Sequence, residues 1–110
     1  MSSHVTVDDV ADVRTGDKGD TAIVAVFPRR PEVYDAVLAA MSEDAVASFL
    51  GAGVTGPVRR TPMPGVQGIV FEVPGLLGGG VTGSPVLDGH GKCLSYLIAT
   101  MPLPGLRHPL

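Results

Sequence analysis

The 110-residue sequence predicts a single domain of the α+β class, in which helices cover one face of an antiparallel or mixed β-sheet. The chain is 45% apolar and 17% charged, which is enough for one hydrophobic core and too short for two domains. Segments with the period of a strand flank a central stretch with the period of a helix. The 15 glycines and 10 prolines are scattered, which predicts many short elements and not disorder. Residues 1–110 are therefore expected to form one domain.

The first half of the chain predicts two strands followed by two helices. Alternating apolar residues over 5–13 predict the first strand, and the β-branched run 21–27 predicts a central strand that is covered on both faces. Apolar residues at i, i+4 and i+8 from Val33 predict an amphipathic helix after Pro31. Ser42 predicts the N-cap of a second helix, which should end at the glycines 51 and 53.

The second half predicts four further strands. Prolines on both sides place the segment 57–64 at a sheet edge, and Ile69, Phe71 and Val73 alternate in the next strand. After a glycine-dense stretch, the sequence DGHGK over 88–92 predicts a hairpin turn that joins strands at 81–88 and 93–101.

Composition excludes several functional classes. The net charge of −3 provides no basic surface for nucleic acid. Cys93 is the single cysteine, so an internal disulfide and a CxxC zinc site are both excluded, and its expected role is that of a buried thiol. The sequence has no signal-peptide pattern and no run of about 20 apolar residues. We expect a cytoplasmic protein that binds neither nucleic acid nor membrane.

Three apparent motifs favour ordinary structural roles. Gly78, Gly80 and Gly83 spell GxGxxG, but Ser84 and Pro85 follow where a nucleotide-binding helix would have to begin. Five acids in the first twenty residues match no calcium-loop spacing; these are Asp8, Asp9, Asp12, Asp17 and Asp20. The three histidines lie near the termini and in the expected hairpin loop, as surface residues do. No metal site is expected.

The stretch VRTGDKGDTAIVAV over 13–26 permits two interpretations. Its glycines allow successive N–H groups to line a concavity, and with the nearby cations they could bind a carboxylate, phosphate or thioester oxyanion. Alternatively, the acids form local Asx turns and the charges face water. The residues concerned are Arg14, Gly16, Asp17, Lys18, Gly19 and Asp20. The glycine-rich segment LLGGGVTGS over 76–84 permits the same two interpretations.

Two separate segments resemble a known family. RTGDKGDTA over 14–22 and LGGGVTGSPVLDGHGK over 77–92 are similar to the two signature segments of the small ferredoxin-like domain of the acyclic terpene utilisation (AtuA-like) family. The likeness extends in order over nearly the whole chain. It implies a ferredoxin-like two-layer sandwich with two helices on one face. Members of that family typically carry a large domain before this small one. In some bacteria the small unit is a separate chain, and the present sequence resembles such a stand-alone unit.

The resemblance also implies a function and a set of site residues. It suggests a small accessory subunit that docks on a larger AtuA-like chain and contributes to a site for branched or terpenoid acyl-CoA thioesters. The CoA thioester is then a substrate, and no cofactor is implied. Lys18 would contact the substrate's anionic group and Asp17 or Asp20 would orient Lys18 or transfer a proton. The implied substrate-binding residues are Arg14, Gly16, Gly19, Gly78, Gly79, Gly80 and Ser84, with Asp88, Gly91 and Lys92 completing the signature.

Two departures leave the activity open. The family usually has Asn-Ile-Gly shortly after GDKGD, where this chain has Ala22 and Ile23, and Gly83 replaces an expected basic residue. One alternative is a purely structural interaction module. Another is a homo-oligomeric acyl-CoA hydratase or isomerase, although a chain of about 11 kDa could enclose a substrate pocket only by association. The expected partners are therefore a larger AtuA-like chain, further copies of this chain, or both.

Overall fold

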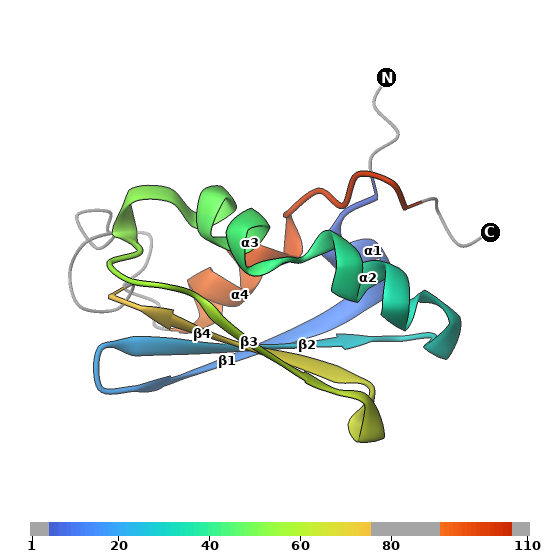
Figure 1. The fold of residues 1–110 in the computed structure, drawn as a ribbon, viewed down its shortest axis with the longest axis horizontal. Helices are drawn as coiled ribbons and strands as arrows, with labels where there is room; N and C mark the ends of the chain where they lie inside the picture. The colour runs from blue at the N-terminus through green and yellow to red at the C-terminus, as the bar shows by residue number, and fades with distance from the viewer. Residues whose placement is uncertain (1–4, 76–90, 107–110) are drawn as a thin grey trace.

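A computed structural model describes residues 5–75 and 91–106 and shows four strands and four α-helices in those ranges (Figure 1). The strands are β1 (Ala11–Lys18), β2 (Thr21–Pro28), β3 (Arg59–Met63) and β4 (Gly68–Pro74). The α-helices are α1 (Val7–Val10), α2 (Tyr34–Ala40), α3 (Glu43–Leu50) and α4 (Gly91–Ala99), and short 3₁₀ turns lie at Pro31–Val33, Gly51–Gly53 and Pro64–Val66.

The four strands form one antiparallel sheet in the order β1-β2-β4-β3. β2 is an inner strand and β3 an edge strand, as predicted. Helices α2 and α3 connect β2 to β3, and β4 lies between these two strands, which makes a split βαβ unit. From β1 onward the order ββαββα is the ferredoxin-like βαββαβ order with its last strand moved to the front. The α+β, ferredoxin-like class predicted from the sequence is confirmed.

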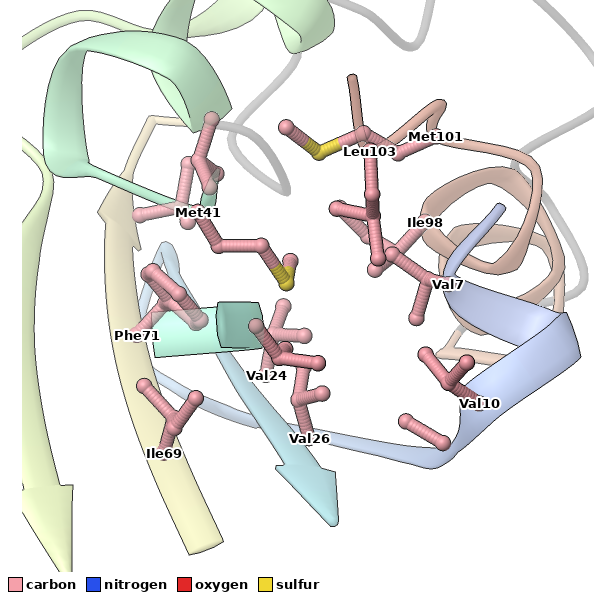
Figure 2. Close-up of a cluster of buried hydrophobic side chains, with 14 of the residues drawn as sticks. Val7, Val10, Val24, Val26, Met41, Ile69, Phe71, Ile98, Met101 and Leu103 are labelled. Carbon is pink, nitrogen blue, oxygen red and sulfur yellow. The ribbon is translucent and has the colours of Figure 1, made fainter. Parts of the chain in front are cut away.

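The hydrophobic core lies between the sheet and the helices, all of which lie on one side of the sheet in Figure 1. Figure 2 shows Val24 and Val26 of β2, Ile69 and Phe71 of β4, and Met41 after α2 directed into one apolar cluster. The cluster is completed from the other end by Val7, Val10, Ile98, Met101 and Leu103. No helix of the described ranges has the length and apolar character needed to cross a bilayer.

The prediction that the strand 21–27 is covered on both faces is wrong. Burial alternates along β2, where Ala22, Val24 and Val26 are buried and the intervening residues are half-buried. No described element covers the second face of the sheet. β-Branched residues are favoured on any partly buried pleated surface, so the continuous apolar run did not distinguish one covered face from two.

Two predicted strand segments are helical. Residues 7–10 form the single turn α1, in which the Asp9 carboxylate accepts a hydrogen bond of 2.8 Å from the backbone N–H of Thr6, and Val7 and Val10 are both buried. In the C-terminal region, Leu94, Ile98 and Met101 are buried at helical spacing, so 93–99 belongs to α4 and not to a strand.

The helical structure of 93–99 also affects the hairpin that the sequence predicted for the C-terminal region. Gly91 and Lys92 of the DGHGK segment begin α4, so this segment does not lead into a strand. The predicted strand at 81–88 and the rest of the expected hairpin turn lie outside the described residues. A short apolar run fits a buried strand and a buried helix equally well, which explains the error.

The two central helices are confirmed, and specific caps define their ends. The Ser42 hydroxyl accepts a hydrogen bond of 3.1 Å from the Ala45 N–H and begins α3, and Gly51 ends it with φ of 79°. Arg60 of β3 donates hydrogen bonds to the carbonyls of Leu38 (2.6 Å) and Met41 (3.0 Å) at the end of α2. This arginine therefore fixes the helix layer to the edge of the sheet.

Candidate functional site

The GDKGD segment forms the end of a hairpin and not a broad glycine turn. β1 continues to Lys18, which pairs with Thr21, so the turn consists of Gly19 and Asp20 alone. Gly19 has φ of 65°, and a glycine with positive φ at the first of two central residues is typical of a type II′ turn. Gly16 lies within the strand, where it pairs with Ile23, and its φ is not positive. Only Gly19 thus uses the conformational freedom that the sequence suggested for both glycines.

Strand alternation separates the charged residues of the segment. Arg14, Gly16 and Lys18 lie on the uncovered face of the sheet, whereas Asp17 lies on the helix side at the exposed end of the strand. All the signature residues from Gly16 to Asp20 are exposed. Within the described ranges, no hydrogen bond or ion pair joins the side chains of Asp17, Lys18 and Asp20. Their assignment as catalytic residues stays a prediction.

The end of β4, which precedes the second signature segment in the sequence, lies beside this hairpin. The Gly75 N–H, at the end of β4, donates a hydrogen bond of 3.0 Å to the carbonyl oxygen of Asp20. Gly75 has φ of 83°, and a Cβ at this position would collide with the Thr55 side chain, so the position requires glycine. The predicted site residues Gly78, Gly79, Gly80 and Ser84 lie outside the described residues, as does Asp88.

The other acids of the N-terminal region have separate local roles. Asp12 forms an ion pair with Arg29 at 3.1 Å, and Asp8 lies 3.9 Å from the same guanidinium group. The Asp9 carboxylate accepts hydrogen bonds from the backbone N–H and the hydroxyl of Thr6 at the start of α1. In the described part of the chain, no three His, Cys, Asp or Glu side chains are grouped closely enough to bind a metal ion.

A shallow cleft of about 600 Å³ runs between β1 and α4. Its lining includes Arg14, which is one of the predicted site residues. The other lining residues are Asp8, Asp12, Val13, Ser95, Tyr96 and Ala99. A second depression of about 240 Å³ shares Asp8, Tyr96 and Ala99 with the cleft. Tyr96 is 76% exposed and lies where the two depressions meet.

Arg14 gives the cleft a positive charge. This side chain is exposed and makes no ion pair with another described residue, whereas the neighbouring Asp12 forms an ion pair with Arg29. The ring and hydroxyl of Tyr96 offer an apolar surface and a hydrogen-bonding group beside it. Sequence reasoning missed Tyr96 and Ser95 because it assigned 93–101 to a strand, whereas the helix α4 places both residues next to β1.

Among the residues that the structure describes, the cleft is open to solvent on one side. Pockets that bind small molecules bury most of the ligand surface, and a groove with one wall missing does not. A substrate bound by Arg14 would therefore remain largely in contact with water unless another polypeptide covers it. The open side of the cleft therefore bears on whether this chain acts as an autonomous enzyme or as a subunit.

The fold and this hairpin together define a small ferredoxin-like α+β domain with a polar edge. The family model of the AtuA ferredoxin-like domain matches residues 5–104, which is nearly the whole chain. The chain belongs to the AtuA ferredoxin-like domain family. No curated protein and no solved structure matches the sequence significantly.

Proposed function

We propose that this protein is a small accessory subunit of a larger AtuA-like assembly that acts on branched or terpenoid acyl-CoA thioesters. The observation that carries the proposal is the cleft between β1 and α4, in which Arg14 is available to an anionic group and which the described residues leave open on one side. A larger chain that docks over this edge would supply the wall and exclude water from the site. Tyr96 is a suitable anchor for such a partner because exposed tyrosines often dominate interface energies.

The signature residues have distinct roles in this proposal. Arg14 binds a carboxylate or phosphate of the thioester, and Lys18, four residues further along the same face of β1, stabilises developing negative charge. In this proposal Asp20, which lies in the two-residue turn next to Lys18, orients Lys18 or transfers a proton. Asp17 suits this role less well, since strand alternation directs it to the opposite face. The glycines 78–80 offer backbone N–H donors.

The proposal is tested in the assembled complex with branched acyl-CoA thioesters as substrates. Arg14→Ala and Lys18→Ala should each lower turnover by at least tenfold, while circular dichroism and the recovery of the complex stay unchanged. Arg59→Ala is the matched control, because Arg59 lies on the same face of the sheet but on the far edge strand. Full turnover in both the Arg14 and Lys18 variants would refute the substrate-binding role.

A second candidate is a structural interaction module without any contact to substrate. The hydrogen bond from the Gly75 N–H to the Asp20 carbonyl supports this candidate, because it joins one residue of the signature hairpin to the end of β4. Under this alternative, substitutions at Arg14 and Lys18 would weaken the complex or lower its melting temperature. Under the main proposal they lower turnover alone.

A further inference from the structure

The face of the sheet opposite the helices carries a continuous apolar strip. Ile23, Ala25 and Phe27 of β2 lie beside Val70 of β4 on this face, and all four are half-buried although no described element covers them. Phe27 lies against Gly68, where an added Cβ would come within 2.9 Å of its ring. At the end of β3, Met63 is 44% exposed, and in the turn that follows Val66 is 61% exposed.

Charged residues on this face follow a definite order. Along β1 they are Asp12, Arg14 and Lys18, with Gly16 between the two cations. The strand pairings place Gly16, Ile23, Glu72 and Arg59 in one row across the sheet, and Arg14, Ala25, Val70 and Thr61 in the adjacent row. Asp12 and Lys18 thus lie toward opposite ends of β1, and Arg14 lies nearer to Asp12.

We propose that this uncovered face is a self-association surface on which two copies of the chain stack sheet to sheet. The two-fold axis lies across the strands, at the row of Thr15. Each β1 then lies over β1 of the second copy in the reverse direction. Asp12, which also pairs with Arg29 of its own chain, faces Lys18 of the second copy, and Lys18 faces its Asp12. Arg14 faces its Gly16, which leaves room for the long side chain. Such a face is complementary to itself, as two-fold interfaces require.

The charges exclude the other face-to-face arrangement. With the axis parallel to the strands, β1 would lie over β3 of the second copy. Arg59 would then face Gly16 of the second copy, between its Arg14 and Lys18. Three cations would gather there near a single acid, Glu72, which lies opposite Arg59 in the β3–β4 pairing. Like charges brought together in this way cost several kcal/mol. The axis across the strands produces opposite-charge pairs instead.

The size of the face indicates a weak dimer. Four strands about 4.8 Å apart and seven residues of about 3.4 Å each give a projected area of roughly 450 Å² per copy. Two copies bury about 900 Å², which is below the roughly 1,200 Å² of the smallest stable interfaces. Stacked sheets lie about 10 Å apart, a distance that a lysine and an aspartate can span together. We expect association in the micromolar to millimolar range.

The dimer would also bring two parts of the candidate site together. Asp12 lines the cleft between β1 and α4, so Lys18 of the second copy would lie at the same cleft as Arg14. In one chain these two cations are separated by three residues of extended strand. This self-association does not depend on the proposed function, because it requires neither the larger partner nor a substrate.

The test is the mass of the purified chain by sedimentation velocity between 10 μM and 1 mM, at low and at high salt. The wild type should shift from the monomer mass of 11.3 kDa toward twice that value as concentration rises, and less so at high salt. Asp12→Lys and Lys18→Asp should each abolish the shift, and the double variant Asp12→Lys/Lys18→Asp should restore it. Asp35→Lys, an equal charge change on the exposed surface of α2, should dimerise like the wild type.

A second pair of variants separates dimer loss from misfolding. Ala25→Asp places a charge in the centre of the face and should give a folded monomer, whereas Ala36→Asp on the exposed side of α2 should have no effect on association. Circular dichroism verifies the fold of each variant. A wild type that remains monomeric at 1 mM would overturn the proposal. So would a dimer that persists in Ala25→Asp, or a double charge swap that fails to restore association.

Discussion

Gly75 donates its backbone N–H to the carbonyl oxygen of Asp20 at 3.0 Å, and this bond fixes the end of β4 to the β1–β2 turn. Two segments that are 55 residues apart in the chain therefore meet at one end of the sheet. Gly75 can make this contact only with φ of 83° and without a Cβ, because Thr55 fills the adjacent space. The chain enters the second signature segment directly after this residue.

Gly75→Ala should therefore destabilise the protein. Strain at positive φ together with the collision with Thr55 should lower the free energy of unfolding by about 2–4 kcal/mol. Gly16→Ala is the control, because Gly16 has no atom within 4 Å of its added Cβ and no positive φ. Its free energy of unfolding should change by less than about 1 kcal/mol. Urea denaturation measures both, and equal losses would show that the close approach to Thr55 has no energetic effect.

Arg60 should contribute to stability, whereas its neighbour Arg59 should not. Arg60→Ala removes two hydrogen bonds to the last carbonyls of α2 and should cost about 1–3 kcal/mol. The bond of 2.8 Å from the backbone N–H of residue 60 to Glu43 remains in this variant. Arg59→Ala should change stability by less than about 0.5 kcal/mol, since the side chain is exposed. Chemical denaturation of the two variants in parallel distinguishes them.

The start of α3 provides a test within one helix. Ser42→Ala removes the acceptor of the Ala45 N–H and should lower the free energy of unfolding by about 1 kcal/mol. Ser48→Ala, on the exposed side of the same helix, should be neutral or slightly stabilising because alanine has the higher helix propensity. A thermal melt in which both variants behave alike would contradict the assignment of Ser42 as the N-cap.

Glu32 supplies a prediction about pH. A hydrogen bond from its own backbone N–H, followed by the side-chain bond and the charge of Arg30 at 2.8 Å, lowers the pKa of this carboxyl group. Because the folded-state pKa of Glu32 is lowered, the stability that its ionised carboxyl group contributes is present above the unfolded-state pKa. This contribution is lost as the pH falls through the folded-state pKa. An NMR titration should give a pKa below that of a free glutamate, and Arg30→Gln should raise it part of the way back. An unchanged pKa in Arg30→Gln would refute the role of the arginine.

Much of the fold could be predicted from the sequence because local signals and tertiary packing agree there. Proline at the start of a periodic apolar segment, Ser42 before two acids, and prolines flanking β3 each indicate one structure only. The errors occur where an apolar run has no such signal. Val7–Val10 and Gly91–Ala99 contain apolar residues at spacings that suit both a strand and a helix, and tertiary packing determines the outcome.

The candidate site was predictable only in part. The signature segment was enough to predict Arg14 as a site residue and Lys18 as part of a hairpin. It was not enough to predict the cleft, which depends on which element packs beside β1. Tyr96 and Ser95 line that cleft because 93–99 is helical, a fact that periodicity did not reveal. Asp17 and Lys18 lie on opposite faces because β1 continues beyond Gly16. The sequence had suggested that a turn begins at Gly16.

The most direct test of the accessory-subunit proposal is native mass spectrometry of the tagged chain, purified at its natural expression level from its own cells grown on a branched or terpenoid carbon source. We predict a stoichiometric complex with a larger AtuA-like chain. Tyr96→Ala should reduce recovery of that chain, and Tyr34→Phe, which changes a buried tyrosine in the core, should not. Recovery of this chain alone, as a monomer or with copies of itself, would contradict the proposal that it is a subunit of a larger assembly.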